Sequence, residues 1–323
     1  MAEGKKRINI LFLGGAKRVS FGRKLIEAGN RMGLEIGIYS YELEAEVPVA
    51  LIGGIIIGRR WGAPDILDHI HQIVGAYHID VLLPFVDGAI SIAGAYVATY
   101  GDAWSPVVRP GLAETLFDKV LSACAFESAG LKIPTTYRGG KPVFPLIAKP
   151  RRGSASKGIE VLNGISDFRR LQNVSDEYLL QTYYPKREEY TVDCYITQKG
   201  ETLCVSPRRR LEVVGGEVSR TVTVDDQDIL ESSRQAVERL GLRGAVTLQY
   251  LRDLESGRLM LMEINPRLGG GVVCSVHAGA DIPAMILAEA CGQPYDGSRE
   301  VRSGVMICRY FEEAVFDVKK NFH

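Results

Sequence analysis

The sequence lacks the features that mark secreted, membrane-spanning or generally nucleic-acid-binding proteins. Its 323 residues contain 39 Lys plus Arg and 39 Asp plus Glu, so no excess of positive charge favours a nucleic acid partner. The six cysteines form no C-x-x-C pair, which is more typical of reduced thiols than of disulfides or a zinc site. The apolar run at residues 8–13 is too short for a signal peptide core, and the run at 49–58 is too short for a membrane span. We therefore expect a cytoplasmic protein that binds neither membranes nor nucleic acids.

Several well-known catalytic signatures are also missing. The turn after the first predicted strand contains Gly14 and Gly15, but Ala16 and Val19 stand where the dinucleotide fingerprint G-x-G-x-x-G requires glycine. A plain strand-to-helix turn and a ligand contact both remain open there. The sequence has no Walker A loop and no G-x-S-x-G elbow. A nicotinamide enzyme is therefore the weakest of the functions considered below.

The chain is too long for a single ordinary core, and its first third predicts a domain of its own. Buried strands alternate there with amphipathic helices, which indicates a doubly wound parallel sheet. The predicted strands span residues 8–15, 34–42 and 79–87, and the predicted helices span 19–33 and 64–78.

The pattern changes after the Pro- and Gly-containing segment 105–111. A single helix is expected over 112–130, and further helices are expected over 226–241 and 282–292. Between them lie pairs of strand-like segments, so this part is predicted to be α+β with antiparallel sheets. The expected pairs are 144–150 with 158–162, 189–197 with 201–214, and 244–253 with 258–267.

The stretch KPRRGSASKGIEVL, from Lys149 to Leu162, places a Gly- and Ser-rich loop between two strands. Gly153 and Gly158 would let backbone amides converge on phosphate oxygens, and Lys149 could reach the same anion from the incoming strand. A solvated hairpin tip favours the same residue types, so both interpretations remain open from this stretch alone.

Polar residues also interrupt the apolar strand LMLMEIN. Glu263 and Asn265 share one face of that strand. If the preceding hairpin loop has an odd length, Gln249 lies opposite Glu263 and Thr247 lies opposite Asn265. One carboxylate and two carboxamides are hard oxygen ligands that Mg²⁺ accepts when phosphates and water complete its shell. The alternative is the wet face of an ordinary hairpin, although an unpaired charge inside an apolar run is unfavourable.

Arginines follow and precede this strand. Arg267, two residues after Asn265, has the forked guanidinium that suits a phosphate or a carboxylate. In the run Arg208, Arg209 and Arg210, strand alternation turns Arg209 away from its neighbours. Either one inward arginine meets an acidic substrate or the run is a solvated cluster.

Taken in order, these motifs resemble the ATP-grasp superfamily, in particular the branch that is similar to the large subunit of carbamoyl-phosphate synthase. The resemblance covers roughly residues 112–300, and the first third resembles the Rossmann-like domain that precedes such folds, with LLPFVDGAI similar to its end-of-strand segment. It implies a Rossmann-like domain at 1–111, a small subdomain with a phosphate lid at 112–180, and a large subdomain with the metal site at 181–323.

The resemblance also implies roles for individual residues. Phosphate contacts would come from Lys119 and Lys149, and the lid would comprise Gly153, Ser154, Ala155, Ser156 and Lys157. The backbone of Gln181, Thr182 and Tyr183 would line the adenine, and Glu189 would hold the ribose. Mg²⁺, or Mn²⁺ in its place, would be carried by Gln249, Glu263 and Asn265, with Arg267 and Arg210 acting on the acyl phosphate and the acid. Three positions depart from the family pattern, namely Thr182 for Glu, Arg187 near the usual Gly, and Gln249 for the Glu of many relatives.

The function that this resemblance implies is an ATP-dependent carboxylate–amine ligase, which forms an acyl phosphate and releases ADP. The alternative is a non-catalytic ATP-binding module or a subunit of an assembly like carbamoyl-phosphate synthase. Carbamoyl phosphate synthesis by this chain alone is not expected, because the chain is too short for the duplicated halves of that enzyme. The sequence does not specify the acid or the acceptor, and a homodimer is left open.

Overall fold

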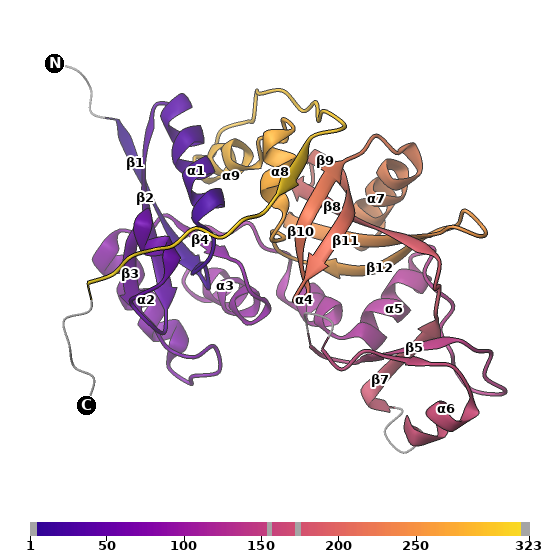
Figure 1. Cartoon of the computed structure of the whole chain (residues 1–323). Coiled ribbons are helices and arrows are strands. Elements are labelled where there is room, and N and C mark those ends of the chain that lie inside the picture. Colours follow the sequence, from indigo (N-terminus) through magenta and orange to yellow (C-terminus); the bar gives the residue numbers. More distant parts are fainter. Residues whose placement is uncertain (1–4, 154–156, 172–175, 318–323) are drawn as a thin grey trace. The chain divides into compact units, whose positions relative to one another are not determined.

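The computed structural model describes residues 5–153, 157–171 and 176–317. The chain divides into two compact units (Figure 1). Unit 1 comprises Met1–Ser105, Pro283–Tyr295 and Arg309–His323, and unit 2 comprises Pro106–Ile282 and Asp296–Cys308. No helix in the described parts of the chain is long and apolar enough to cross a membrane.

Unit 1 contains the predicted parallel sheet, with the strand order β3-β2-β1-β4. Its strands are β1 (Lys6–Leu13), β2 (Leu34–Glu42), β3 (Gly54–Ile57) and β4 (Val81–Pro84), and its helical segments include α1 (Val19–Arg31), η1 (Pro48–Leu51), α2 (Ile66–Tyr77) and α3 (Asp87–Thr99). Residues 8–13 of β1 are buried, and this central strand has a hydrogen-bonded neighbour on each side. Strand β3 adds an edge strand within a segment for which the sequence indicates only an apolar run.

The glycine turn after β1 is closed by a carboxylate of the same unit. Gly14 has φ +73°, and a Cβ at this position would lie 2.7 Å from the Val86 side chain. The backbone amides of Gly15 and Ala16 donate to the Glu42 carboxylate, whose pKa is raised by burial. In a dinucleotide-binding domain, amides at this turn hold the pyrophosphate. Here they are already engaged, so the turn serves as a tight strand-to-helix connection.

Unit 2 begins with two helices where one was predicted. Helix α4 (Pro110–Phe117) ends at Asp118, and α5 (Lys119–Ser128) begins immediately after it. Asp118 has an extended backbone, and its carboxylate accepts the amides of Val120 and Leu121 at 3.0 and 3.1 Å. The prediction of a single helix over 112–130 is therefore wrong, because an N-cap residue interrupts it.

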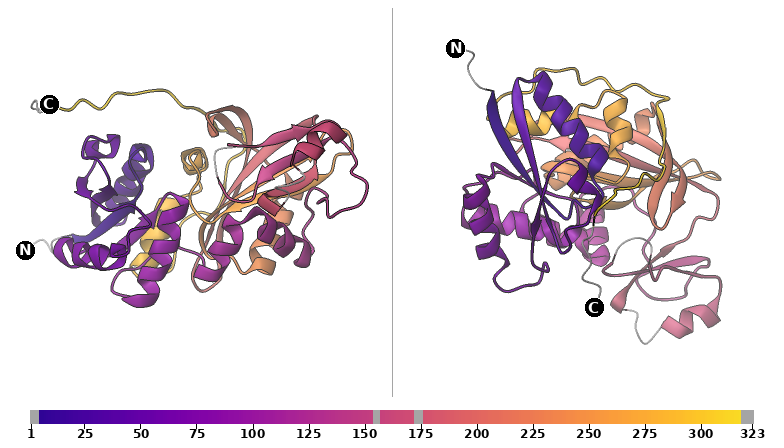
Figure 2. Two further views of the ribbon diagram at one scale, coloured as in Figure 1. Left: turned by 90° about the horizontal axis from the view of Figure 1, so that it is seen from below. Right: turned by 60° about the vertical axis from the view of Figure 1, so that its left-hand side comes forward.

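The smaller sheet of unit 2 forms a lobe together with α6 (Ile165–Leu171), visible in Figures 1 and 2. It has the order β6-β5-β7, and its strands are β5 (Leu146–Pro150), β6 (Glu160–Leu162) and β7 (Tyr178–Thr182). All its pairs are antiparallel, which confirms the predicted hairpin of β5 with β6. The core of the lobe consists of the buried residues Leu146, Ala148, Leu162, Leu171 and Leu180. Strand alternation places Lys149 and Gln181 on the opposite face.

The larger sheet of unit 2 is antiparallel, with the order β12-β11-β8-β9-β10-β13. Its strands are β8 (Arg187–Ile196), β9 (Thr202–Val214), β10 (Glu217–Thr223), β11 (Gly244–Asp253), β12 (Leu259–Asn265) and β13 (Met306–Cys308). Helix α7 (Gln227–Leu240) lies on one face, where the Ser233 hydroxyl is 3.3 Å from that of Tyr250. Helices α8 (Val272–His277) and α9 (Ile282–Ala290) follow β12. The other face carries the polar side chains of Thr191, Gln249 and Glu263 beside buried apolar ones such as Leu251.

The predicted pairing of Gln249 with Glu263 is confirmed, but for a different reason than the one expected. The loop is not odd in length, because the Asp253 amide donates to the Arg258 carbonyl and closes an even hairpin. A register shift next to Gln249 leaves Met262 without an opposite residue. This bulge brings Glu263 into line with Gln249. Bulges are frequent beside functional sites, where they redirect a side chain.

Candidate functional site

Polar residues from three adjacent strands share one face of the larger sheet. The register aligns Glu263 of β12 with Gln249 of β11, and Gln249 with Thr191 of β8. One row further along, Asn265 aligns with Thr247. Because residues in register on an antiparallel sheet point the same way, these side chains form one contiguous polar surface.

The predicted metal ligands are brought together on this surface. Gln249, Glu263 and Asn265 are all partly exposed, whereas the intervening Leu248 and Ile264 are buried. No hydrogen bond or ion pair within the described residues engages the side chains of Gln249 or Asn265. No group of three or more His, Cys, Asp or Glu side chains in the described segments could hold a metal ion. The oxygen donors fit Mg²⁺ when phosphate oxygens and water complete the shell, and they fit a tightly held structural ion poorly.

Lys149 reaches the same region from the smaller sheet. Its Nζ donates to Gln181 Oε1 at 2.9 Å, and Gln181, which is 2% exposed, donates through Nε2 to the Pro134 carbonyl at 3.2 Å. Burial lowers the pKa of Lys149 to about 8, with Glu263 raising it and Lys119 lowering it further. Lys149 thus lies within electrostatic range of Glu263 on the larger sheet.

The loop after β5 is anchored to the break between α4 and α5. Lys119 Nζ donates to the Gly153 carbonyl at 2.8 Å, and Arg151 Nε donates to Asp118 Oδ2 at 2.5 Å. Burial raises the pKa of Asp118, but the Leu121 amide and Arg151 lower it more, so that the net shift is downward. The predicted lid residues Ser154, Ala155 and Ser156 lie outside the described residues, and Lys157 is exposed.

The sequence-based prediction missed Asp118. The signal that could have revealed it is an N-cap residue type inside a long helical pattern.

Glu189, predicted to hold a ribose, is bound by two arginines. Arg187 Nε lies 2.9 Å from Oε1, and Arg210 Nη1 lies 3.3 Å from Oε2. The Arg187 guanidinium also lies 5.1 Å from the centre of the Tyr183 ring. Arg210, predicted to act on the acid, is thus positioned on the polar face with Glu189 as its partner.

Two backbone amides of the predicted adenine segment are engaged by carbonyls of the connection between α5 and β5. The amide of Thr182 donates to the Thr135 carbonyl at 2.9 Å, and that of Tyr183 donates to the Pro145 carbonyl at 3.0 Å. An adenine base bound at this segment would therefore use groups other than the Thr182 and Tyr183 amides.

The alternation predicted for the arginine run is confirmed. Arg209 lies on the far face of the sheet and binds Glu188 at 2.9 Å. Arg208 is 1% exposed and makes a two-pronged ion pair with Asp193, with distances of 2.6 and 3.1 Å. Ser275 donates to the same carboxylate at 2.6 Å. Because Arg208 is buried and paired, it cannot meet a substrate, and its role is to support the polar face from within.

The turn that carries Arg267 packs against the buried Arg208. The Arg267 amide donates to the Asn265 carbonyl, and the Arg267 carbonyl accepts the Thr247 hydroxyl, both at 2.7 Å. A Cβ at Gly271 would lie 2.6 Å from Arg208 Nη1. The glycines after Arg267 therefore allow the chain to pass directly over the buried arginine, which fixes the start of α8.

Comparison with known proteins identifies this architecture. Residues 175–313 match the model of a family described as an ATP-grasp in the biosynthetic pathway with Ter operon. Among solved structures, the biotin carboxylase domain of 2-oxoglutarate carboxylase from Hydrogenobacter thermophilus is similar, with a TM-score of 0.72 at 16% identity. The match covers 92% of this chain and 73% of that one. The chain has the ATP-grasp fold.

Two further solved structures share the ATP-grasp fold of this chain. N5-carboxyaminoimidazole synthetase from Staphylococcus aureus has a TM-score of 0.72 at 16% identity and covers 93% of this chain and 82% of its own. L-amino acid ligase from Bacillus licheniformis has a TM-score of 0.70 at 15% identity and covers 93% and 78%. No curated protein sequence matches the chain. The predicted ATP-grasp fold is confirmed, whereas the branch that is similar to carbamoyl-phosphate synthase stays a prediction.

Proposed function

We propose that the chain is an ATP- and Mg²⁺-dependent ligase that activates a carboxylate as an acyl phosphate. An amine or a similar nucleophile then displaces phosphate. The observation that carries the proposal is the convergence of the Lys149 ammonium on a face where Glu263 is flanked by two carboxamides whose side chains have no partner among the described residues. A lysine ammonium opposite hard oxygen ligands suits a polyphosphate that arrives with its own metal ion.

In this proposal the residues act by position and charge. A carboxylate oxygen of the substrate attacks the γ-phosphorus of ATP and ADP leaves; the amine then attacks the acyl carbon, phosphate leaves, and the amine loses a proton. Lys119 and Lys149 bind phosphate oxygens, and Arg267 stabilises the acyl phosphate. Gln249, Glu263 and Asn265 would hold Mg²⁺, which would supply charge neutralisation on the transferred group. No covalent nucleophile is required, because preorganised charges account for most of the acceleration in such transfers.

The nucleoside end of the site is proposed at Glu189. Its carboxylate would accept the ribose hydroxyls while Arg210 holds it in place. Arg187 must release Glu189 or share it, because both Glu189 oxygens already have a partner.

The similar structures support an ADP-forming reaction. The carboxylase domain was crystallised with MgADP and bicarbonate, and the S. aureus synthetase was crystallised with ADP. The third is named as a ligase of amino acids.

The proposal is tested by measuring ADP release on a matrix of carboxylic acids and amines. We expect release that requires one particular acid and Mg²⁺ and that rises further with one class of amine. ATP binding without ADP release across a broad matrix would instead identify a non-catalytic nucleotide-binding module.

The affinity for MgADP is expected to fall with rising pH because of Lys149. Burial holds the pKa of Lys149 at about 8 in the free protein, and a bound phosphate would raise it. Binding above pH 8 therefore takes up a proton, and the affinity should drop by up to about tenfold per pH unit there and stay level below pH 7. Calorimetric titration between pH 6.5 and 9.5 measures this, with Lys149→Met as the comparison. An equal slope in Lys149→Met would show that another group titrates.

A further inference from the structure

A cavity lies within unit 2, apart from the polar face that carries the proposed nucleotide site. Its volume is about 490 Å³, which is in the range of sites for small organic ligands. Its walls come from the segment after α5, from Tyr184 and from the start of β12. None of the predicted site residues that the structure describes lines it. The apolar part of the wall includes Leu131, Ile133 and Leu259.

The polar part of the wall is rich in donors. Lys132, Arg258 and Thr135 line the cavity, and no hydrogen bond or ion pair within the described residues engages their side chains. The acid among the lining residues, Glu127, is already paired with Arg138. The cavity thus combines two cations and a hydroxyl with an apolar wall, and its carboxylate is neutralised.

We propose that this cavity binds a small organic anion, namely an apolar body that carries one carboxylate, sulfonate or phosphate group. The anionic group lies between Lys132 and Arg258, where charge-assisted hydrogen bonds favour it over a neutral polar group. The apolar body covers the wall at Leu131, Ile133 and Leu259. A cationic ligand is disfavoured, because it would meet two positive charges and a carboxylate that Arg138 already holds.

The cavity wall is tied to both halves of the proposed nucleotide site. The Lys132 carbonyl accepts the amide of Leu261, two residues from Glu263, at 2.8 Å. The Pro134 carbonyl accepts Gln181 Nε2, and the Gln181 Oε1 atom holds Lys149. The segment that lines the cavity is therefore hydrogen-bonded both to the strand that carries Glu263 and to the residue that holds Lys149. Binding of the anion does not depend on the proposed function.

The binding is tested with 8-anilinonaphthalene-1-sulfonate, which joins an aromatic body to one sulfonate. Its fluorescence is titrated on the whole chain without nucleotide. The double variant Lys132→Glu with Arg258→Glu is expected to weaken binding at least about tenfold, because it replaces both charge-assisted bonds by repulsion. Both residues are exposed at the surface, so folding is expected to be retained.

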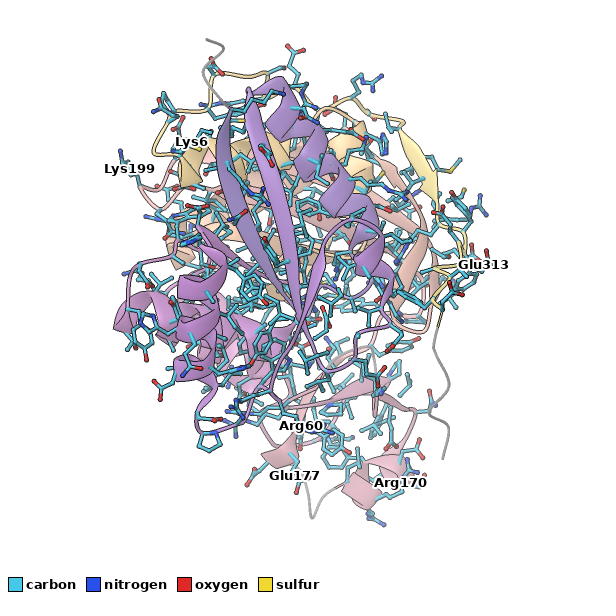
Figure 3. The ribbon with its side chains drawn as sticks, turned by 90° about the vertical axis from the view of Figure 1, so that its left-hand side faces the viewer. Lys6, Arg60, Arg170, Glu177, Lys199 and Glu313 are labelled. Atoms are coloured by element: carbon cyan, nitrogen blue, oxygen red, sulfur yellow. The ribbon has the colours of Figure 1, made fainter. Side chains whose placement is uncertain are left out.

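The matched control carries the same change of charge elsewhere in unit 2. Lys199→Glu with Arg234→Glu alters two exposed residues outside the cavity, the first of which is visible at the surface in Figure 3. This control should bind the dye as the wild type does. Equal weakening in both double variants, or none in either, overturns the proposal. Complete displacement of the dye by MgADP also overturns it, because the dye would then occupy the nucleotide site.

Discussion

Replacing Glu263 with glutamine is expected to lower acid-dependent ADP release by about 100- to 1,000-fold. Glu263 is the one carboxylate among the three proposed Mg²⁺ ligands, and its register partner Gln249 is neutral. The substitution keeps the shape of the side chain and removes the only negative charge that the ligand set contributes. The metal and the triphosphate should then be held too weakly to align the transferred phosphoryl group.

The measurement is ADP release at saturating acid, with the Mg²⁺ concentration varied in each protein. Glu255→Gln provides the matched control, because Glu255 lies in the loop between β11 and β12 and pairs with Lys186 at the surface. We expect the control to retain wild-type activity. Comparable activity in Glu263→Gln and in Glu255→Gln at every Mg²⁺ concentration would contradict the role given to Glu263.

Replacing Asp193 with asparagine is expected to lower the free energy of unfolding by about 3–5 kcal/mol. Asp193 and Arg208 are each 1% exposed, and the substitution leaves the guanidinium buried without a counter-charge. The loss is measured by urea denaturation. Because Arg208 lies directly under the glycine turn after Arg267, activity should fall along with stability.

Two comparison variants distinguish the loss of the buried counter-charge from a general effect of substitution on the free energy of unfolding. Glu201→Gln breaks the exposed pair with Arg299, whose side chains are 56% and 46% exposed, and should cost less than about 1 kcal/mol. The double variant Asp193→Leu with Arg208→Met removes both charges and should regain most of the stability. A cost under about 1 kcal/mol for Asp193→Asn would show that the pair does not stabilise the sheet.

Much of the proposed site follows from the sequence because its signals are local. Glu263 and Asn265 are two positions apart in an otherwise apolar strand, which predicts that they share one face. The alternation of Arg208 and Arg209 is predictable for the same reason. The alternation of side chains along the strand does not predict the bulge at Met262. The bulge is needed because the hairpin loop is even in length, and that length is set by backbone hydrogen bonds that residue types do not specify.

The remaining features depend on contacts between residues far apart in the chain. Glu42 closes the turn at Gly15 through backbone amides, and no local pattern predicts which carboxylate does so. The partner of Arg208 is likewise decided by the pairing of β8 with β9, which places Asp193 next to it. Asp118 is an intermediate case, since its residue type indicates an N-cap but its bond with Arg151 is tertiary.

The most direct test of the account is a crystal structure of the chain with Mg²⁺ and ADP. We predict that Lys149 Nζ lies about 3 Å from a phosphate oxygen and that Glu263 and Asn265 contact the metal directly or through water. ADP bound away from Lys149, or a metal ion held elsewhere with Glu263 turned from the phosphates, would contradict the central claim that these residues form one nucleotide site.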